Sequence, residues 1–404
     1  MRRGAADDPS GQEGLAALTA DMLDEGTGTW SAIEVHQQLA RIGAQFDIDI
    51  GADATLVGVT ALNRFAERGL NLLADIIVRP TFGEADVLRV RQLRLNRLIQ
   101  IRDMPGVIAD RAFARLLYGD APYGHTPLGS ERTLAPLTVD DVRAFHARLI
   151  RPGSATLVAV GDCEHDTVRR LAETAFGDWA AGTGPEAEER DTVAQPARLN
   201  IVPRPAAPQS ELRIGQVAVA RATPDYHALV AANMVLGGQY VSRINLNLRA
   251  DKGITYGART AFDFRRRPGP FALQASVDSL ATGLAIRESM DEIAAIRGGR
   301  PVSADELAVG VAALTRGYAR NFETADQIAR AVAQLALYGL PDDYYSEFVP
   351  RVESLTPEEV MGAAARHLDP ARLTTLVVGD VDAAGQELGR LNLGDPVILS
   401  PDSI

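Results

Sequence analysis

The sequence predicts an α+β protein with two homologous α/β-sandwich domains, each built on a mainly antiparallel sheet that helices cover. Three observations support this prediction. The chain has 404 residues, which is long enough for two to four domains. Its two halves share a sequence pattern. Strands that alternate apolar and polar residues occur among segments of helical periodicity, and this mixture favours an antiparallel or mixed sheet with helices on one face.

The two halves share a segment that aligns without a gap. Residues 137–162 match residues 355–380 at an offset of 218, with 10 identities in 26 positions. In each copy Leu-Thr followed by acids predicts a helix start, a proline ends the helix, and a strand ending in Gly-Asp follows. The Arg-Pro pair at 79–80 also recurs at 300–301. Two unrelated domains would match in this order only by chance, so we infer an internal duplication.

A change of composition near the middle of the chain predicts the boundary between the two domains. Residues 179–185 are rich in Gly and Ala and end in Pro, and residues 186–191 are mostly charged. Such a composition is typical of a linker. We therefore place an N-terminal domain at residues 1–185, a linker at 186–199 and a C-terminal domain at 200–404.

The elements follow from periodicity. Helical spacing of apolar residues predicts helices at residues 14–25, 66–77, 85–101 and 228–236. Alternation predicts strands at residues 45–50 and 271–277. In the first strand three apolar residues alternate with Asp47 and Asp49, so we expect one covered face and one face in water. Gly237-Gly238 follows a predicted helix and is interpreted as a C-cap or tight turn.

Composition excludes several classes of function. The chain has 41 Lys and Arg against 53 Asp and Glu, and this net charge of −12 repels phosphates, so we expect no nucleic-acid partner. Its single cysteine, Cys163, excludes a disulfide within the chain and a zinc site built from cysteines. No apolar run approaches the roughly 20 residues of a membrane span. The first residues, MRRGAADDPSG, show no signal-peptide pattern.

No local catalytic motif is evident. The six histidines include no pair at the i, i+4 spacing that places two metal ligands on one helix face. His125 lies in a Tyr-Gly-His-Thr-Pro turn, and His165 follows a predicted strand as a surface residue. The sequence also lacks Gly-x-Ser-x-Gly, a phosphate-cradling glycine loop and a plausible catalytic Cys–His pair. The residues alone therefore predict no self-sufficient active site.

An ordered set of short motifs covers nearly the whole chain: GLA at 14–16 with Met22-Leu23 and Gly26-Thr27, RPTF at 79–82, PYGH at 122–125 with Gly129, Leu248-Arg249 through Gly253 to Tyr256, and FET at 322–324 leading to LYG at 337–339. Together these motifs resemble the pitrilysin/insulinase-type zinc peptidases, the group that includes mitochondrial processing peptidase and its bacterial relatives. The resemblance implies two similar α+β domains with the fold of the inverzincin metallopeptidases.

In this family one helix carries His-x-x-Glu-His, which supplies two zinc ligands and the general base. Here the first ligand position holds Ala17, the general-base position holds Ala20, and the second ligand position holds Asp21. The family's third ligand is a glutamate on the helix after the Arg-Pro pair, but residues 88–102 contain no acid. Catalytic zinc requires three protein ligands and an open position, so the resemblance implies a degenerate site and no metal in this chain.

The resemblance also implies that one functional pair is retained in the second domain. The family carries an arginine and, seven residues later, a tyrosine that bind substrate near the scissile bond, and Arg249 and Tyr256 match them. An arginine fork can hold a peptide carbonyl or a carboxylate, and a tyrosine hydroxyl can donate to a carbonyl oxygen that gains negative charge. The alternative is that Arg249 pairs with Asp251 or another acid and Tyr256 caps a core.

In bacterial members of the family the zinc motif and the Arg/Tyr pair can lie on two chains that close around one chamber. The resemblance therefore implies the zinc-free subunit of a heterodimeric metallopeptidase, inactive alone, that binds peptide substrates. Its homologous partner would supply the zinc and the glutamate that activates water. The alternative is a catalytically inactive assembly subunit of a larger complex, in which Arg249 and Tyr256 are remnants.

The beginning of the chain also departs from the family. The family places a β-hairpin before the loop that leads into the first helix, whereas here that loop begins almost at Met1. We therefore expect the 404-residue sequence to be truncated, by a late start codon or by processing, with room for an upstream signal peptide. Under this expectation the location is periplasmic, and otherwise it is cytoplasmic.

Overall fold

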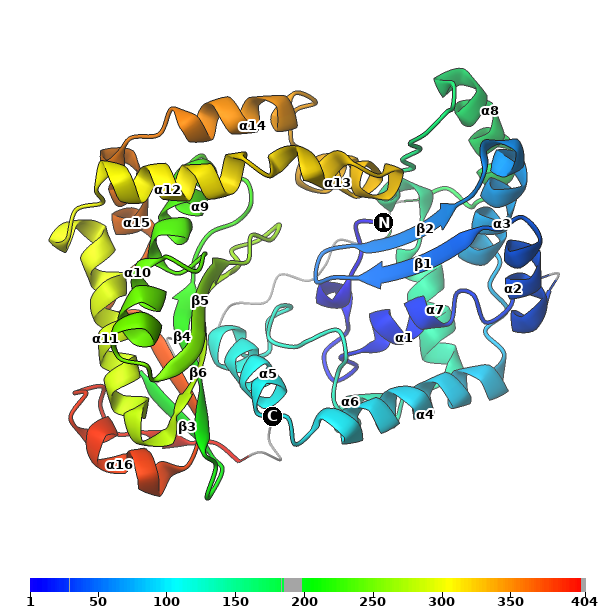
Figure 1. Ribbon diagram of the computed structural model, residues 1–404. Helices are drawn as coiled ribbons and strands as arrows, with labels where there is room; N and C mark the ends of the chain where they lie inside the picture. The colour runs from blue at the N-terminus through cyan, green and yellow to red at the C-terminus, as the bar shows by residue number, and fades with distance from the viewer. Residues whose placement is uncertain (29, 183, 185–197, 401–404) are drawn as a thin grey trace. The chain divides into compact units, whose positions relative to one another are not determined.

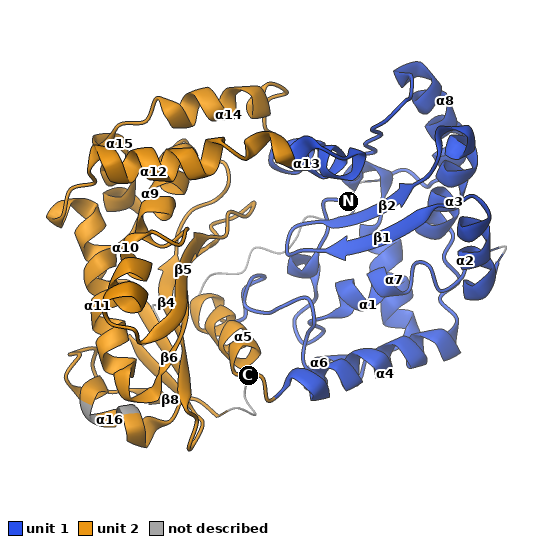
Figure 2. Ribbon diagram, in the orientation of Figure 1, with its two compact units in different colours: residues 1–102, 120–191, 321–339 blue, residues 103–119, 192–320, 340–404 orange. Residues whose placement is uncertain are grey.

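The computed structural model describes residues 1–404 except 29, 183, 185–197 and 401–404. Most of the predicted linker, residues 186–199, therefore lies outside the described residues. The chain forms two compact units (Figure 2). Unit 1 contains residues 1–102, 120–191 and 321–339, and unit 2 contains residues 103–119, 192–320 and 340–404. Each unit is formed mainly by one half of the sequence and takes one segment from the other half.

The two exchanged segments contain one helix each. Helix α5 (Pro105–Tyr118) belongs to unit 2, and helix α13 (Ala325–Tyr338) belongs to unit 1. Their first residues lie 325 − 105 = 220 positions apart, close to the sequence-repeat offset of 218. Helices α7 (Val139–Leu149) and α15 (Pro357–His367) lie 357 − 139 = 218 positions apart. The duplication thus extends to the fold, including the helix that leaves its own half.

Unit 1 contains a two-stranded antiparallel sheet with helices around it. Strand β1 (Gln45–Ile50) pairs with β2 (Thr55–Thr60). The other helices of this unit are α1 (Leu15–Asp21), α2 (Ala32–Arg41), α3 (Ala66–Val78), α4 (Glu84–Ile101), α6 (Glu131–Leu134) and α8 (His165–Phe176), with 3-10 turns at Ala5–Asp7, Asn63–Phe65 and Pro152–Ser154. The strand predicted at 45–50 and the helices predicted at 66–77 and 85–101 are confirmed.

The helix predicted at residues 14–25 is wrong at its C-terminal end, because α1 ends at Asp21. Beyond it the chain turns through Gly26, whose φ of +130° favours glycine. The Gly26 carbonyl accepts a hydrogen bond from the Thr81 N–H at 3.0 Å. Pairing with a segment far away in the sequence therefore ends the helix, while Met22 stays fully buried in the core.

The strand predicted after α7 does not form. Residues 156–161 form no strand, whereas the matching segment of the second half is strand β7 (Thr374–Gly379). Strand β7 forms because β3 (Leu199–Pro203) and β4 (Gln209–Val217) pair with it on either side. In the described part of unit 1 no strand occupies either position. Without partners for its backbone groups, the same sequence pattern makes no strand.

Unit 2 is built on a six-stranded sheet in the order β5-β6-β4-β7-β3-β8. Its pairs are antiparallel except those of β3, which runs parallel to β7 and β8. The further strands are β5 (Thr255–Phe262), β6 (Pro270–Asp278) and β8 (Val397–Ile398). The helices are α9 (Tyr226–Leu236), α10 (Arg243–Asn245) with the π-helical turn Leu246–Asp251, α11 (Thr282–Ala294) with the π-helical turn Ala295–Gly299, α12 (Ala304–Thr315), α14 (Tyr344–Glu353), α15 and α16 (Val381–Gly389), with 3-10 turns at Ser279–Ala281 and Tyr318–Phe322.

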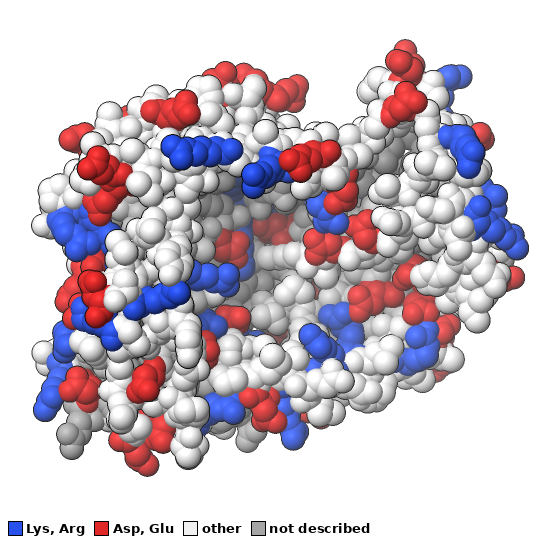
Figure 3. Space-filling view, viewed as in Figure 1, with Lys and Arg blue, Asp and Glu red and all other residues white. Residues whose placement is uncertain are grey.

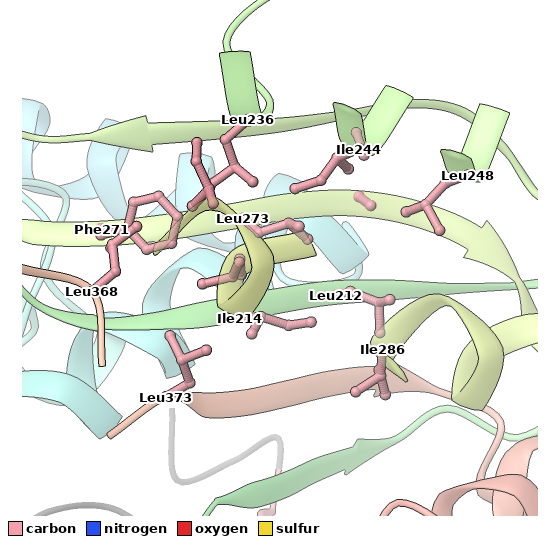
Figure 4. Packing of buried hydrophobic residues seen from close by; sticks show 14 of the residues in the cluster. Leu212, Ile214, Leu236, Ile244, Leu248, Phe271, Leu273, Ile286, Leu368 and Leu373 are labelled. Carbon is pink, nitrogen blue, oxygen red and sulfur yellow. The ribbon is translucent and has the colours of Figure 1, made fainter. Parts of the chain in front are cut away.

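One face of this sheet carries the core of unit 2. Leu212 and Ile214 of β4 and Phe271 and Leu273 of β6 are fully buried there, together with Ile286 of α11 (Figure 4). Burying one side chain of this size contributes about 1.5–3 kcal/mol, so the alternation decides which face the helices α9 and α11 cover (Figure 1). The strand predicted at 271–277 and the helix predicted at 228–236 are confirmed.

Helix α5 covers the opposite face of the sheet. Arg213 lies between Leu212 and Ile214 on β4, so it points away from the core. Its guanidinium donates to the Asp110 carboxylate at 2.8 Å and to the Gly106 carbonyl at 3.2 Å, both on α5. Only 5% of the Arg213 side chain is exposed. The exchanged helix is therefore held to unit 2 by a buried arginine as well as by apolar contacts.

Helix α13 has the corresponding place in unit 1. Arg330 of α13 pairs with Asp47 at 2.8 Å and with Asp49 at 3.4 Å, on the polar face of β1. The expectation that this face lies in water is therefore wrong in part, because a helix from the other half of the sequence contacts it. The alternation on β1 identified the two faces correctly but carried no information about that distant helix.

Candidate functional site

The predicted Arg/Tyr pair lies in unit 2, between the end of α9 and the start of β5. Helix α9 ends at Gly237, as predicted, and the N–H groups of Gly237 and Gly238 both donate to the Asn233 carbonyl, at 2.9 and 2.7 Å. A Cβ on Gly237 would lie 2.6 Å from Thr260 Oγ1 on β5. This close approach requires glycine, so the turn at Gly237, where the site begins along the chain, packs tightly against β5.

The helical residues 243–251 carry Arg249. Ile244 and Leu248 are buried, and both point into the core of unit 2 (Figure 4). Each contributes about 1.5–3 kcal/mol by burial, which fixes the rotation of this segment about its axis. Arg249 directly follows Leu248 and is only partly buried. The Arg249 side chain therefore points away from the core of unit 2.

A second arginine on the same segment is structural. The Arg243 side chain is 3% exposed and binds the Glu306 carboxylate with two nitrogens, at 2.7 and 2.8 Å. It also donates to the carbonyls of Arg300 and Pro301, each at 3.0 Å. The Arg243 guanidinium lowers the pKa of Glu306 to about 2. With all of its groups bonded inside the unit, Arg243 attaches the segment to α12.

Asn245 attaches the segment to its neighbours on the other side. This buried amide donates to the carbonyls of Gln239 at 3.1 Å and Ala258 at 2.6 Å, and to Ser242 Oγ at 3.2 Å. Its oxygen accepts from the Ala258 N–H at 2.9 Å. One side chain thus joins the loop after α9, the helical segment and strand β5, which are the three pieces that carry the site.

Tyr256 lies at an irregularity in β5. The register of β5 against β6 shifts between Thr255 and Ala258. The Thr255 hydroxyl accepts from the Gly257 N–H at 3.1 Å and donates to the Ser276 carbonyl at 2.7 Å. Bulges of this kind redirect a side chain out of the sheet. Tyr256 is accordingly 92% exposed, so it does not cap a core as the structural alternative required.

Arg249 is oriented by an aromatic ring. The centre of its guanidinium lies 4.1 Å from the centroid of the Tyr240 ring. Among the described residues, no carboxylate forms an ion pair with Arg249, and Asp251 in particular does not. The alternative of a structural Arg249–Asp251 pair is therefore contradicted. Its N–H groups are available to a ligand, unlike those of Arg243.

This arrangement suits the binding of a peptide carbonyl or carboxylate. A guanidinium presents several N–H donors in a planar fork, and stacking on an aromatic ring leaves its edge accessible. The Tyr256 hydroxyl adds a single hydrogen-bond donor on a side chain from a different element. Neither a guanidinium nor a phenol is a general base near neutral pH, so Arg249 and Tyr256 can bind and polarise a carbonyl group but do not activate water by themselves.

The positions that correspond to the zinc motif lie in unit 1, on helix α1. Asp8 holds the start of this helix, because its buried carboxylate accepts from the N–H groups of Gly14 at 2.7 Å and Ala16 at 2.6 Å. His125, predicted as a turn residue, lies 3.2 Å from the same carboxylate. Burial raises the pKa of Asp8. The helix is thus well formed, although its metal ligands are missing.

The residues at these positions do not fit zinc. Ala17 and Ala20 are buried methyl groups without donor atoms. Asp21 is ion-paired with Arg94 of α4, and Arg94 also donates to the Pro127 carbonyl at 3.0 Å. A guanidinium at this place would repel a divalent cation. Within the described residues, no three His, Cys, Asp or Glu side chains come together as a ligand set.

Sequence reasoning missed three residues of these sites. Arg94 lies in the stretch 88–102 that contains no acid, and its contact with Asp21 depends on the packing of α4 against α1. Tyr240 and Asn245 were not singled out, although an aromatic residue just after Gly237-Gly238 was a visible signal. Their roles depend on contacts with Arg249 and Ala258 that spacing along the chain does not predict.

Acidic and basic side chains are intermixed over the face drawn in Figure 3. In the part of the chain that the structure describes, no helix has both the length and the apolar character needed to cross a membrane. What marks the Arg249 region is that this arginine has no carboxylate ion-pair partner among the described residues and contacts the exposed ring of Tyr240.

Known proteins resemble this chain over most of its length. An uncharacterized zinc protease of Mycobacterium bovis is 24% identical over 380 residues, which are 93% of this chain and 86% of that protein. One from Streptomyces coelicolor is 22% identical over 382 residues, 93% of this chain and 83% of the other. These relatives are named zinc proteases, whereas the motif positions of this chain do not fit the metal.

Solved structures have the same fold. A peptidase M16 inactive domain from Pseudomonas fluorescens superimposes with a TM-score of 0.86 at 24% identity, covering 94% of this chain and 90% of that one. A protease from Helicobacter pylori gives a TM-score of 0.84 at 18% identity, with 93% and 92% covered. The predicted α+β fold with two domains is thereby confirmed.

Family models match both parts of the sequence. Residues 1–125 match the insulinase model, peptidase family M16. Residues 136–314 match the model of the peptidase M16 inactive domain. The two matches cover unit 1 residues that include Asp21 and unit 2 residues that include Arg249 and Tyr256. The chain therefore belongs to the insulinase family of peptidases, family M16.

Proposed function

We propose that this chain is the zinc-free subunit of a heterodimeric M16 peptidase and contributes Arg249 and Tyr256 to peptide hydrolysis by a homologous partner. In this proposal Arg249 holds a backbone carbonyl or carboxylate of the peptide. Tyr256 donates a hydrogen bond to a carbonyl oxygen as negative charge develops on it. The metal and the group that activates water belong to the partner chain.

The observation that carries this proposal is the state of the Arg/Tyr pair. Arg249 has no carboxylate partner among the described residues. Tyr256 is 92% exposed, although Thr255 and Ala258 on either side of it are held by hydrogen bonds. Neither an exposed tyrosine nor an arginine without an ion pair among the described residues contributes much to the stability of unit 2. A ligand-binding pair requires accessible donor groups, and the exposure of Tyr256 and the absence of an ion pair at Arg249 among the described residues support this role.

The partner is inferred from what this chain lacks. Ala17, Ala20 and the Asp21–Arg94 ion pair leave no metal-binding group on α1 and α4. Arg249 and Tyr256 can bind a peptide carbonyl but do not activate water. A peptidase reaction therefore needs a second chain with the intact motif, and the family to which this chain belongs makes a homologue the natural source.

The first test is reconstitution. We expect the purified chain to contain no stoichiometric zinc and to cleave no peptide, and to restore cleavage when it is mixed with a zinc-bearing homologue that co-purifies with it. Zinc is measured by mass spectrometry and cleavage with a quenched fluorescent peptide. Retained zinc together with hydrolysis by this chain alone would contradict the proposal.

The second test addresses the residues within the complex. We expect Tyr256→Phe to lower turnover about 10²- to 10³-fold, the usual effect of removing one donor to a developing oxyanion. Arg249→Ala is expected to lower kcat/KM about 10- to 100-fold, in line with the loss of a charged hydrogen bond. Arg259→Ala is the matched control, because Arg259 is also exposed on β5 but binds Gln274 within the sheet, at 2.7 Å.

A second candidate function is an assembly subunit without a role in catalysis. The Asp21–Arg94 ion pair favours it, because the former metal position has become an ordinary structural contact. Under this alternative, Arg249→Ala and Tyr256→Phe leave the turnover of the intact complex unchanged. Size-exclusion chromatography of each variant complex separates the two cases, because lost activity with intact assembly supports only the active-subunit proposal.

A further inference from the structure

The contact between Arg249 and Tyr240 joins a ligand-binding group to a residue with no assigned role. The guanidinium centre lies 4.1 Å from the ring centroid, within the range of a cation–π interaction. In the described part of the chain no carboxylate pairs with Arg249, so the Tyr240 ring is the group that attracts its positive charge. The orientation of the guanidinium therefore depends on Tyr240.

The ring itself stands on a firmly held loop. The Gln239 carbonyl, one residue before Tyr240, accepts from the Asn245 amide at 3.1 Å and from the Ser242 N–H at 3.2 Å. The loop begins at Gly237, where the close approach to Thr260 leaves no room for a shift toward β5. The Tyr240 backbone is thus fixed relative to the helical segment that carries Arg249.

The side chain of Tyr240 has little reason to be aromatic for stability alone. It is 68% exposed, and the neighbouring Val241 is 50% exposed. An exposed ring contributes little to the core of unit 2. What the ring does provide is a flat surface that limits the rotamers of the long Arg249 side chain, and ordering such a side chain in advance reduces the entropy lost when it binds.

We infer that Tyr240 is a positioning residue for Arg249, holding the guanidinium over its ring so that the N–H groups are ready for the peptide. This inference rests on the proposed role of Arg249 in peptide binding. Tyr240 acts through Arg249 and need not touch the substrate. Losing the Tyr240 ring would weaken peptide binding, so it would change KM more than kcat.

The test is a double-mutant cycle in the complex of this chain with its zinc-bearing homologue. Tyr240→Leu removes the ring at an exposed position and is expected to raise KM about three- to tenfold with little change in kcat. Tyr240→Phe keeps the ring and is expected to restore most of the affinity. In the Arg249→Ala background, Tyr240→Leu is expected to have no further effect. Val241→Ala, at the next exposed residue, is the matched control.

The outcomes separate the two claims. If Arg249→Ala lowers kcat/KM but Tyr240→Leu leaves KM unchanged, the positioning role is overturned and the proposed function stands. If Tyr240→Leu raises KM equally with and without Arg249, the ring acts independently of Arg249 and the inference is also overturned. If Arg249→Ala has no effect, the proposed function itself fails. Thermal melting of each variant verifies that unit 2 remains folded.

Discussion

The guanidinium of Arg94 on α4 is paired with the carboxylate of Asp21 at the end of α1, the residue that the resemblance matches to the second zinc-ligand position. The Arg94 side chain is 13% exposed and that of Asp21 is 42% exposed, so the pair is only partly shielded from water. The contact keeps two helices together without a metal. It also neutralises the single acidic group left at the motif positions, Ala17, Ala20 and Asp21.

Replacing Asp21 tests whether this position retains any metal function. We expect Asp21→Ala to lower the free energy of unfolding by no more than about 1 kcal/mol, because half-exposed ion pairs contribute little. The variant should leave zinc content and the activity of the complex unchanged. Denaturant unfolding and metal analysis measure these quantities. A loss of zinc or of turnover with Asp21→Ala would show that the site is not degenerate.

Removing Arg330 tests how the exchanged helix is held to unit 1. None of the residues of α13 is fully buried, and Arg330 binds Asp47, Asp49 and also Asp326 at 3.0 Å. Arg330→Ala leaves three neighbouring carboxylates without their cation. We expect faster amide hydrogen exchange throughout α13, and a smaller difference from the unmodified protein at high salt, since screening weakens exposed pairs.

The control for this experiment is Arg169→Ala on α8. Arg169 also pairs with two carboxylates, Asp166 and Glu173, but both lie on its own helix. Its loss should leave exchange in α13 unchanged. Equal exchange of α13 in the Arg330→Ala variant and the unmodified protein would mean that apolar contacts alone hold the exchanged helix.

The pair of Arg243 and Glu306 predicts loss of stability in acid. The pKa of Glu306 is lowered to about 2 in the folded state, against an ordinary value of 4.5. The stabilisation is therefore complete above about pH 4.5 and is lost as the pH falls toward 2. We expect Glu306→Gln to be less stable at neutral pH and to lose less stability over this interval. Parallel pH curves for the two proteins would contradict this assignment.

The imidazole of His227 predicts a second pH effect at higher pH. It lies among the rings of Tyr226, Tyr344 and Phe348, and burial, with Arg351 and Arg221 nearby, lowers its pKa to about 4. The unfolded chain takes up the proton near pH 6.5 but the folded chain does not, so stability falls as the pH decreases from about 6.5 to 4.

Substituting the ring removes this component. We expect His227→Phe to flatten the stability curve between about pH 6.5 and 4, measured by thermal unfolding at each pH. His165→Gln serves as the control, because His165 is exposed at the start of α8. A curve for His227→Phe that keeps the slope of the unmodified protein would assign the pH dependence to other groups.

The sequence by itself determined the local features of this protein. Alternation identified β1 and β6, and helical spacing identified α3, α4 and α9, because these periods reflect which side of an element is apolar. The repeat at an offset of 218 revealed the two homologous halves. That Ala17, Ala20 and Asp21 stand at the motif positions followed from the sequence alone, through the resemblance.

Only the tertiary structure decided which distant groups meet. Residues 156–161 align with β7 at the repeat offset of 218, yet a strand forms only where β3 and β4 supply partners. Likewise Arg94 meets Asp21, and Tyr240 meets Arg249, through the packing of separate segments. Periodicity records the environment of one segment, whereas strand pairing, ion pairs and ring stacking depend on two segments and on the chain that brings them together.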